Sequence, residues 1–409
     1  MSVTKVSNDN ILSMSAAKLT GGMPAMDGSA LTGIVAGSEA MTGAGDPANE
    51  TNPADGVGAL YINTTTGEMF ICTDATTDQN EWNNVGEGSG DVTYVAWAPQ
   101  GTQYGYFAAG YNAGPTTRYD IIERYSFTTD QSASDVGNLY AGGTSSPFGH
   151  SSIDYGWVSG GWSGAISLGI QKFSYASQTD SVDHGATLYG DTATQGNSSA
   201  ASCGTADYAY IVGGHKSDPN ENWDIIQKFP YASQTNAVSI GNMAYPTGLY
   251  QQCGWSSSTH CYSAGGYDYG PGYGQFSDIE KFSFASEGAG VNCSNLSAET
   301  SYTAGSSSTT HGYTSGGFST NWLFTSKIDK MSFATEATAS SIGNLSVAKR
   351  SPVGSASTTD GYAAGGMLSD NTTGTPSIEK YSHTSDGTVN IIGDITLTRS
   401  GGTTGNIQF

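Results

Sequence analysis

Short stretches of alternating apolar and polar residues recur along residues 91–409. Along Ile279–Phe284, for example, the alternation places Glu280 and Phe282 on one face of a strand and Lys281 on the other. An aromatic-rich strand ending in two small residues, usually Gly-Gly, precedes each such stretch, and a Gly-Asn-Leu-like segment follows it. The pattern predicts an all-β chain of short strands with little helix.

This unit occurs six times, at steps of 49 to 53 residues. The last glycine before the variable loop is found at Gly110, Gly161, Gly214, Gly266, Gly317 and Gly366. In each unit an acidic or amide residue is followed by a basic residue, Lys or Arg, which we call the base. These pairs are Glu123-Arg124, Gln171-Lys172, Gln227-Lys228, Glu280-Lys281, Asp329-Lys330 and Glu379-Lys380. A fixed period of this length, built from short strands, predicts the six blades of a β-propeller.

Spacings within the unit separate scaffold from loops. The base is followed after 13 residues, in all six copies, by a third position occupied by Gly137, Gly185, Gly241, Ser294, Gly343 and Gly393. The step from the double glycine to the base varies from 11 to 15 residues, and the step to the next double glycine varies from 23 to 29. In a four-stranded blade both variable segments lie on one face of the ring. Binding loops vary on a constant scaffold, so this face is the predicted functional surface.

The repeated base itself is predicted to be structural. Its aliphatic stem can cover the neighbouring blade while its charged group meets a carbonyl or a carboxylate. Six equivalent positions indicate architecture, because a binding site is concentrated in particular blades.

Charge and composition exclude several classes of partner. The chain has 14 basic and 36 acidic residues and a net charge of −22, which repels phosphate backbones and anionic membrane surfaces. Nucleic-acid binding is therefore not expected. Membrane insertion is not expected either, since no apolar run approaches the length of a membrane span and no secretory signal opens the chain.

The five cysteines form no paired framework, and we expect free thiols made in a reducing cytoplasm. One alternative stays open, because Cys253 and Cys261 fall in adjacent predicted strands, where a disulfide is possible.

Residues 1–45 differ from the rest of the chain. Their apolar residues stand in a Gly-rich segment too short to bury them, which predicts an attachment and multimerisation segment ordered by other chains. The residues expected to make these contacts are Ile11, Leu12, Leu19, Leu31 and Ile34. A disordered tail is the alternative.

Residues 46–90 are predicted to form a small collar. Within it, residues 57–85 form a β-hairpin around a Thr-Gly turn with Trp82 as a cap, between linkers at 46–55 and 86–90. The propeller then spans residues 91–409.

Two stretches carry a family resemblance. The sequences AAKLTG…PAMDGSALTGI at residues 16–34 and GALYINTTTGEMFIC…EWNNVG at residues 58–86 resemble N-terminal and collar segments of tail fibres of tailed bacteriophages. The six repeats resemble the kelch-like propeller repeats of virion proteins of marine phages, cyanophages especially. Lys-aromatic-Ser-aromatic strands replace the Tyr and Trp landmarks of cellular kelch repeats, so no binding residue is transferred. The resemblance implies a virion structural role, often as homotrimers.

Motifs for catalysis or metal binding are not found in the sequence, and no enzyme activity, metal or cofactor is expected. His260 and His311 share one repeat position, where Asp360 stands in the next copy, and this position fits a turn whose polar side chain bonds local backbone. Asp218 and Glu221 lie close in sequence, which is weak evidence for glycosidase chemistry.

Aromatic residues in the variable loops are the candidate binding residues. They can form flat platforms on which sugar rings stack, beside Asp and Asn side chains. The predicted glycan or receptor contacts are Tyr267, Tyr269, Tyr273, Trp162, Trp223 and Trp322. The alternative is that these rings pin the loops to the scaffold or contact a neighbouring chain.

Together these observations predict a phage virion protein, made in the host cytoplasm and released by lysis. The first hypothesis is a tail fibre or comparable appendage whose propeller binds a host-surface glycan. The alternatives are a capsid- or tail-decorating protein without a specific receptor and, third, a glycan-active enzyme. Expected partners are other virion proteins through residues 1–45, identical chains in a homotrimer, and a host polysaccharide. Either residues 93–98 or residues 401–409 are expected to close the ring.

Overall fold

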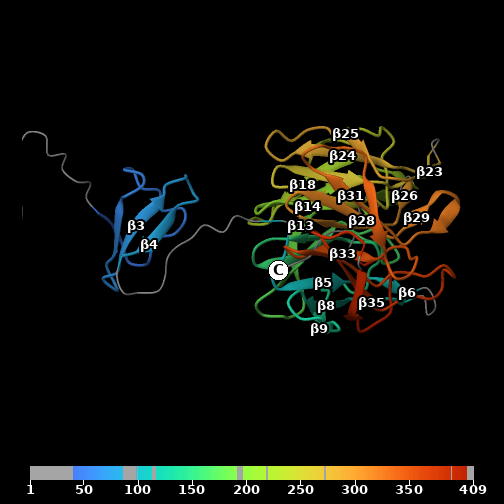
Figure 1. Cartoon of the computed structure of the whole chain (residues 1–409), viewed down its shortest axis with the longest axis horizontal. Helices are drawn as coiled ribbons and strands as arrows, with labels where there is room; N and C mark the ends of the chain where they lie inside the picture. The colour runs from blue at the N-terminus through green and yellow to red at the C-terminus, as the bar shows by residue number, and fades with distance from the viewer. Residues whose placement is uncertain are drawn as a thin grey trace, which may run out of the picture. The chain divides into compact units, whose positions relative to one another are not determined.

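A computed structural model describes residues 40–85, 98, 100–112, 117–190, 197–217, 220–270, 273–387 and 389–402. These residues form short β-strands and turns, and their one helical element is the three-residue 3-10 turn η5 (Thr320–Trp322), so the all-β prediction is confirmed. The chain divides into two compact units, residues 1–96 and 97–409, each described separately below (Figure 1).

The smaller unit contains one four-stranded sheet in the order β1-β2-β3-β4. Its strands are β1 (Met41–Gly43), β2 (Leu60–Asn63), β3 (Met69–Asp74) and β4 (Glu81–Asn84). The predicted hairpin is β2 and β3, and β1 adds to β2 in parallel. Tyr61, Phe70 and Trp82 are buried together on one face, and the rings of Tyr61 and Trp82 meet edge to face at 5.9 Å.

The predicted linker at residues 46–55 contains no strand, and it hydrogen-bonds to the sheet and to the turn that precedes β4. Asn63 donates to the Asp46 carboxylate at 2.7 Å, and the buried Asn80 amide donates to the Asn49 carbonyl and the Asn52 side chain at 2.5 and 2.6 Å. Long-range amide and carboxylate contacts of this kind cannot be read from a polar composition. The predicted linker at 86–90 lies outside the described residues, as do Ile11, Leu12, Leu19, Leu31 and Ile34.

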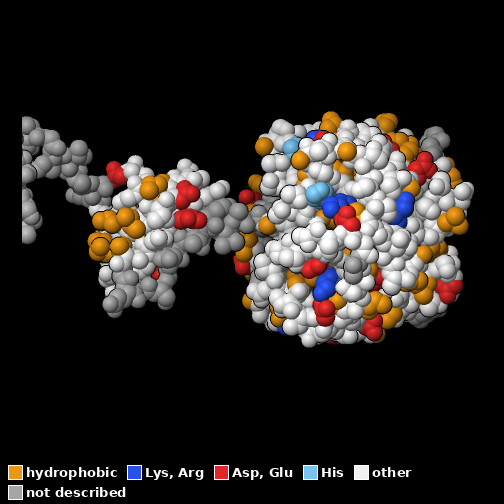
Figure 2. Space-filling model, viewed as in Figure 1, with side chains coloured by type: hydrophobic (Ala, Val, Ile, Leu, Met, Phe, Trp, Pro, Cys, Tyr) orange, Lys and Arg blue, Asp and Glu red, His pale blue; other side chains and the backbone are white. Residues whose placement is uncertain are grey.

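The other face of the small sheet is apolar and exposed. Leu60 and Met69 stand on it, in cross-strand register with Ile71 and Ile62 respectively. Val57 nearby is 66% exposed. Figure 2 shows hydrophobic side chains gathered on one side of this unit. A sheet face of this kind suits contact with another apolar surface.

The larger unit contains one main antiparallel sheet for each of the six sequence repeats, together with shorter sheets in the variable loops. Sheet 1 contains β5 (Tyr104–Ala108), β8 (Ile121–Ser126) and β9 (Ser134–Asn138); sheet 2 contains β10 (Phe148–Ser151), β11 (Tyr155–Ser159), β12 (Gly169–Ser174) and β13 (Val182–Thr187); and sheet 3 contains β14 (Ala201–Gly204), β15 (Tyr208–Val212), β18 (Ile225–Pro230) and β19 (Val238–Asn242). Sheet 4 contains β20 (Cys253–Ser256), β21 (His260–Ala264), β24 (Asp278–Ser283) and β25 (Val291–Asn295); sheet 5 contains β27 (Ala304–Ser307), β28 (His311–Ser315), β31 (Lys327–Ser332) and β32 (Ser340–Asn344); and sheet 6 contains β33 (Val353–Ala356), β34 (Asp360–Ala364), β35 (Ser377–Ser382) and β36 (Val389–Asp394).

Each sheet repeats the same irregularity. The register between its last two strands shifts just before the acidic or amide residue that precedes the repeated Lys or Arg. The shift lies at Ile279/Glu280 in sheet 4 and at Ile328/Asp329 in sheet 5. A β-bulge bends a strand and locally increases its twist. The bulged hairpin explains why the step of 13 residues is constant.

Successive sheets touch along their first strands, from β10 through β14, β20 and β27 to β33, and β33 in turn contacts β5 of sheet 1. The backbones of neighbouring first strands approach each other so closely that a side chain larger than that of glycine would clash. A Cβ at Gly305 would lie 2.5 Å from the Gly254 carbonyl oxygen. Backbone therefore packs against backbone where these first strands meet.

Six residues in left-handed conformation, one from each repeat, form a circle of backbone hydrogen bonds. They are Ser146, Ser199, Gln251, Tyr302, Ser351 and Gly401, with φ between 51° and 61°. The N–H of each donates to the carbonyl of the one before it, at 2.6 to 3.1 Å, and the N–H of Ser146 donates to Gly401 at 2.7 Å. The circle thus returns to its starting residue through six equivalent bonds.

Four of the six repeated basic residues pair with a carboxylate of the next sheet, as predicted. Lys281 pairs with Glu336 of sheet 5, and Lys380 of sheet 6 pairs with Asp130 of sheet 1 at 2.6 Å. Equivalent pairs join Lys228 to Glu287 and Lys330 to Asp386. Arg124 and Lys172 instead lie over the rings of Tyr104 and Tyr155, because glutamines, Gln178 and Gln234, occupy the acidic position opposite them.

The residue before each base is buried and faces the preceding sheet. Glu280 accepts the N–H groups of Ala244 and Tyr245 at 3.1 and 3.0 Å, and burial raises its pKa despite these bonds. The equivalent Glu123 accepts the Thr396 N–H of sheet 6. In two copies this carboxylate also meets a buried cation, in the pairs Glu379–Lys349 and Glu123–Arg399.

The cysteine prediction is wrong for two of the five thiols. Cys203 on β14 is paired with Cys261 on β21, with Cα atoms 5.8 Å apart, whereas Cys72, Cys253 and Cys293 are free. The open alternative, Cys253 with Cys261, is not formed. The disulfide lies where β14, the first strand of sheet 3, contacts β21, the second strand of sheet 4. Of the two segments proposed to close the ring, 93–98 and 401–409, the structure describes residues 98, 401 and 402, and the remainder lies outside the described residues.

Candidate functional site

The two variable segments of each repeat meet on one face of the larger unit, as the spacings predict. The residue after the double glycine forms an antiparallel bridge with the residue just before the left-handed position, as in Trp162 with Ser145 and Tyr267 with Tyr250. This bridging holds the start of each variable loop against the end of the segment between sheets. Short hairpins extend some of these loops: β6 (Tyr111–Asn112) with β7 (Thr117–Arg118), β16 (His215–Ser217) with β17 (Asn220–Asn222), β22 (Tyr267–Asp268) with β23 (Gly274–Gln275), and β29 (Phe318–Ser319) with β26 (Thr300–Ser301) and β30 (Leu323–Phe324).

Two cavities open among these loops, and Tyr269 lines both. We call the first the aromatic cavity; its volume is about 600 Å³. It is lined by Ser145, Ser146, Trp162, Ile166, Ser198, Ser199, His215, Tyr250, Tyr269 and Tyr302. Four aromatic residues and four serines therefore combine apolar walls with hydroxyl donors and acceptors.

Ring contacts fix the aromatic walls in place. Tyr269 stacks on Tyr250 with centroids 5.3 Å apart and an angle of 18°. The Arg118 guanidinium lies 3.8 Å from the centroid of the Trp162 ring, which is 41% exposed. Such contacts orient the rings before any ligand arrives, which lowers the entropy cost of binding.

Two phenol groups of this cavity, those of Tyr250 and Tyr302, stay neutral at physiological pH. Burial raises the pKa of Tyr250, and burial also raises the pKa of Tyr302. None of the described lining residues is acidic. The aromatic cavity can therefore offer neutral phenol and serine hydroxyls to a ligand.

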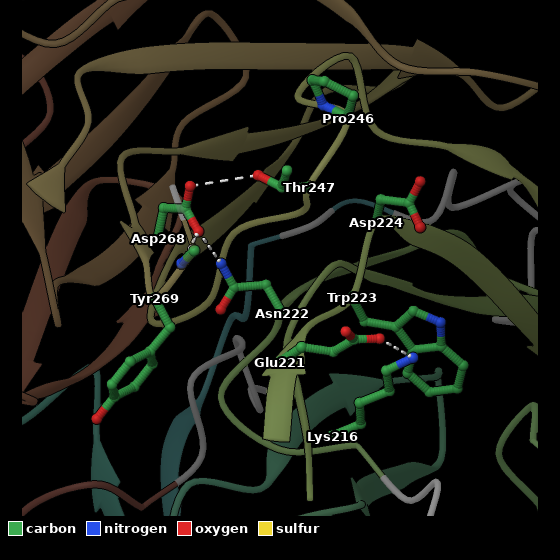
Figure 3. Close-up of a pocket in the computed structure, with 10 residues that line it drawn as sticks. Lys216, Glu221, Asn222, Trp223, Asp224, Pro246, Thr247, Asp268 and Tyr269 are labelled. Carbon is green, nitrogen blue, oxygen red and sulfur yellow. Dashed lines mark hydrogen bonds and ion pairs between the residues drawn. The ribbon is translucent and has the colours of Figure 1, made fainter. Parts of the chain in front are cut away.

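The second cavity, which we call the carboxylate cavity, has a volume of about 360 Å³ (Figure 3). It is lined by Lys216, Glu221, Asn222, Trp223, Asp224, Pro246, Thr247, Asp268, Tyr269 and Gly270. Lys216 and Glu221 face each other across hairpin β16–β17 and form an ion pair of 2.5 Å. Three carboxylates and one ammonium thus give this cavity a net negative charge.

Asp268 organises the carboxylate cavity from a fully buried position. Its Oδ1 accepts from the Asn222 amide at 2.7 Å and from the Gly270 N–H at 2.6 Å. Its Oδ2 accepts from the Tyr245 and Thr247 hydroxyls at 3.2 and 3.3 Å. One carboxylate therefore ties together the loop 267–276, the loop 215–224 and the segment that joins sheets 3 and 4.

The six predicted aromatic residues fall into two groups. Trp162 and Tyr269 line the aromatic cavity, and Trp223 and Tyr269 line the carboxylate cavity. Tyr267 is 1% exposed, with its ring within 5.5 Å of the rings of Tyr269, Tyr273 and Trp322, so it supports the loop. Tyr273 and Trp322 are exposed but are not among the residues named for either cavity.

Other cavity residues had not been identified from the sequence. Tyr250 and Tyr302 belong to the segments between sheets, which the spacings marked as variable without naming residues. Asp268 stands inside the aromatic loop, but its role depends on Asn222, which is 46 residues away in sequence. The sequence signal that could have identified these residues is their place in the repeat, next to the left-handed positions, as with Tyr250 before Gln251.

The remaining sequence predictions concern metals, histidines and surface charge. His260 and His311 stand at the first residues of β21 and β28, and their side chains bond the hydroxyls of the preceding Thr259 and Thr310 at 2.8 Å rather than the local backbone that was predicted. Over the described part of the chain, no three His, Cys, Asp or Glu side chains gather in a way that could hold a metal ion. Asp218, named with Glu221 above, lies outside the described residues.

The visible face of the larger unit is mostly uncharged, with basic and acidic side chains in small separate groups (Figure 2). Among the described residues, no helix has the length and apolar character needed to cross a membrane. A comparison with known protein families finds none whose model matches this chain, and a comparison with curated proteins finds no match either.

Proposed function

We propose that the six sheets are the blades of a closed, kelch-like β-propeller. Three sets of contacts support the closure. The circle of left-handed residues returns from Gly401 to Ser146, Lys380 of the last sheet pairs with Asp130 of the first, and β33 contacts β5. The terminal ion pair repeats the geometry of the internal ones, as expected when a ring of equivalent blades closes.

On this propeller, the face with the two cavities binds a glycan. The observation that carries this proposal is the pair of adjoining cavities around Tyr269, built from the loops whose lengths vary between repeats. Their aromatic rings and hydroxyl, amide and carboxylate groups are the combination that holds sugars, with apolar ring faces stacked and hydroxyls hydrogen-bonded. The acidic chain repels polyanions, which favours a sugar over a nucleic acid.

The protein acts as part of a phage virion, in a tail fibre or comparable appendage, and the glycan belongs to the host surface. The support is the resemblance of residues 16–34 and 58–86 to fibre segments, together with the exposed apolar face around Leu60 and Met69. In a homotrimer this face is covered by neighbouring copies, and several weak sites on one particle gain about 10²–10⁴ in avidity.

Binding of the purified full-length protein to a glycan array tests the glycan proposal. The variant Tyr269→Ala removes the ring shared by both cavities, and binding should fall at least tenfold because stacking area and one hydroxyl are lost. Tyr140→Ala is the matched control, since Tyr140 is 66% exposed and is not among the residues named for either cavity. Equal loss in both variants, or unchanged binding by Tyr269→Ala, contradicts the proposal.

Immunogold electron microscopy with an antibody against residues 97–409 tests the virion proposal. Label at the ends of tail appendages is the expected result. Label over the capsid or tail tube would instead indicate a decorating protein, and particles without label would refute the virion assignment.

A further inference from the structure

Two arginines without a carboxylate partner stand beside the aromatic cavity. Seven basic residues of the described part of the chain form ion pairs with Asp or Glu, but Arg118 and Arg350 are not among them. The Arg118 guanidinium lies 3.8 Å from the centroid of the Trp162 ring, and the Arg350 guanidinium lies 5.4 Å from the centroid of the Tyr302 ring. Because both rings line the aromatic cavity, both positive charges lie close to its walls.

The position of Arg350 in the repeat supports this placement. Arg350 directly precedes the left-handed residue Ser351, and the residues at the equivalent position in three other repeats are Ser145, Ser198 and Tyr250. All three line the aromatic cavity. Each of the four forms an antiparallel bridge with the residue that follows a double glycine. The backbone of Arg350 is therefore equivalent in position to three residues of the cavity wall.

Both guanidinium groups keep donors that a ligand can reach. Arg350 is half-buried; its Nε donates to Asn371 Oδ1 at 3.2 Å, and Nη2 contacts the Met367 sulfur, a weak acceptor, at 3.3 Å. Its Nη1 has no partner in the described part of the chain and is not among the enclosed atoms. In Arg118, which is also half-buried, Nε is enclosed but the two terminal nitrogens are not. The outer nitrogens can therefore donate to a ligand.

The surroundings of this cavity favour an anion although the whole chain is acidic. None of the described lining residues is acidic. Burial lowers the pKa of Arg350, because its charge has lost hydration without gaining a carboxylate, and a ligand anion would supply the missing counter-charge. The net charge of −22 is spread over the chain and is screened beyond about 8 Å at physiological ionic strength. The two adjoining guanidiniums therefore dominate the local field.

We propose that the aromatic cavity is the subsite for an acidic sugar unit, whose carboxylate or sulfate group pairs with Arg350 and is attracted by Arg118. The inference rests on the proposed glycan-binding function and specifies its ligand. Charge-assisted hydrogen bonds from a guanidinium to such oxygens are stronger than those between neutral groups. The volume of about 600 Å³ lies within the range of small-molecule sites.

The test compares matched glycans on one array with the full-length protein. Trigalacturonate and its methyl ester differ in charge but not in sugar, and sialyllactose, sulfated lactose and lactose distinguish a carboxylate from a sulfate. The wild-type protein should bind an acidic member roughly tenfold more tightly than its neutral counterpart. This preference should shrink as NaCl is raised from about 50 to about 500 mM, because salt screens the attraction.

Two variants and a matched control identify the charges responsible. Arg350→Gln and Arg118→Gln each remove one charge, and the ratio of acidic to neutral glycan binding should fall roughly fivefold in each. Arg124→Gln is the control, since Arg124 is also half-buried and lies over a tyrosine ring, 4.2 Å from the Tyr104 centroid. Arg124 is not among the residues named for either cavity, so its replacement should leave the ratio unchanged.

The remaining outcomes separate this inference from the proposed function. Equal or tighter binding of the neutral members by the wild-type protein overturns the inference, while loss of that binding in Tyr269→Ala leaves glycan binding standing. Equal loss of acidic and neutral binding in Arg350→Gln and Arg118→Gln also overturns it, because the arginines would then only hold the loops in place. Binding to no glycan of the array overturns both.

Discussion

Replacing Glu123 by glutamine should reveal how strongly the last sheet is joined to the first. Glu123 and Arg399 form an ion pair in which both side chains are 0% exposed. The Arg399 guanidinium also lies 4.5 Å from the centroid of the Phe107 ring, so no water surrounds it on that side. Glu123→Gln keeps the size of the side chain and an oxygen for the Thr396 N–H, but leaves the buried guanidinium without its counter-charge.

The expected cost follows from burial. Removing one partner of a buried ion pair destabilises a protein by about 3–5 kcal/mol, because the remaining charge has lost both its hydration and its partner. The Lys281–Glu336 pair provides the comparison, since its side chains are 23% and 25% exposed. Glu336→Gln should cost about 1 kcal/mol or less, as is usual for solvent-screened pairs.

The repeats themselves supply a compensating variant. Gln171 and Thr144 stand at the positions equivalent to Glu123 and Arg399 at the boundary between sheets 1 and 2. The double variant Glu123→Gln/Arg399→Thr removes the unpaired charge and should be about 1 kcal/mol or more stable than Glu123→Gln alone.

Equilibrium urea unfolding, followed by tryptophan fluorescence, measures these differences, because Trp157 and Trp255 are buried in the larger unit. The reasoning is refuted if Glu123→Gln lies within 1 kcal/mol of the wild-type protein. It is also refuted if the double variant loses the sum of the two single losses.

Two further predictions concern pH and cysteine pairing. Burial lowers the pKa of His150 to about 3, so below pH 6.5 the unfolded chain binds a proton that the folded chain does not, and stability falls on acidification. Wild-type urea stability should therefore decrease between pH 6.5 and pH 4.5 by up to about 1.4 kcal/mol per pH unit more than that of His150→Gln; equal slopes would contradict this. Peptide mapping of air-oxidised protein without reduction should recover Cys203 linked to Cys261, and Cys203→Ser should lose the about 2–4 kcal/mol that such a link contributes. A recovered link between Cys253 and Cys261 would instead show that the pairing register of β20 with β21, within sheet 4, differs from the one described.

Much of the repeat architecture was accessible from sequence, because it depends on residues close together in the chain. Alternation along Ile279–Phe284 predicted which side of the strand carries Lys281, and the structure pairs that lysine with a carboxylate of the next sheet. The constant step of 13 residues identified a hairpin, and the varying steps identified the face on which the cavities open. Local period and local turn chemistry are enough for such predictions.

The cavities could be located from sequence only in part. Trp162, Trp223 and Tyr269 were named because aromatic residues in long loops are conspicuous. Tyr267 belongs to the same loop, yet it is buried, since its neighbours Tyr269, Tyr273 and Trp322 surround its ring. Composition alone does not distinguish a ring that supports a loop from one that lines a cavity.

The sequence by itself determined the all-β class, the six repeats, the structural role of the repeated bases and the face with variable loops. Only the tertiary structure decided which side chains meet across sheets: Cys203 with Cys261, Asn222 with Asp268, and Glu123 with Arg399. The physical reason is that hydrogen bonds within a hairpin are set by neighbouring residues, whereas contacts between sheets depend on the twist and lateral register of segments far apart in the chain.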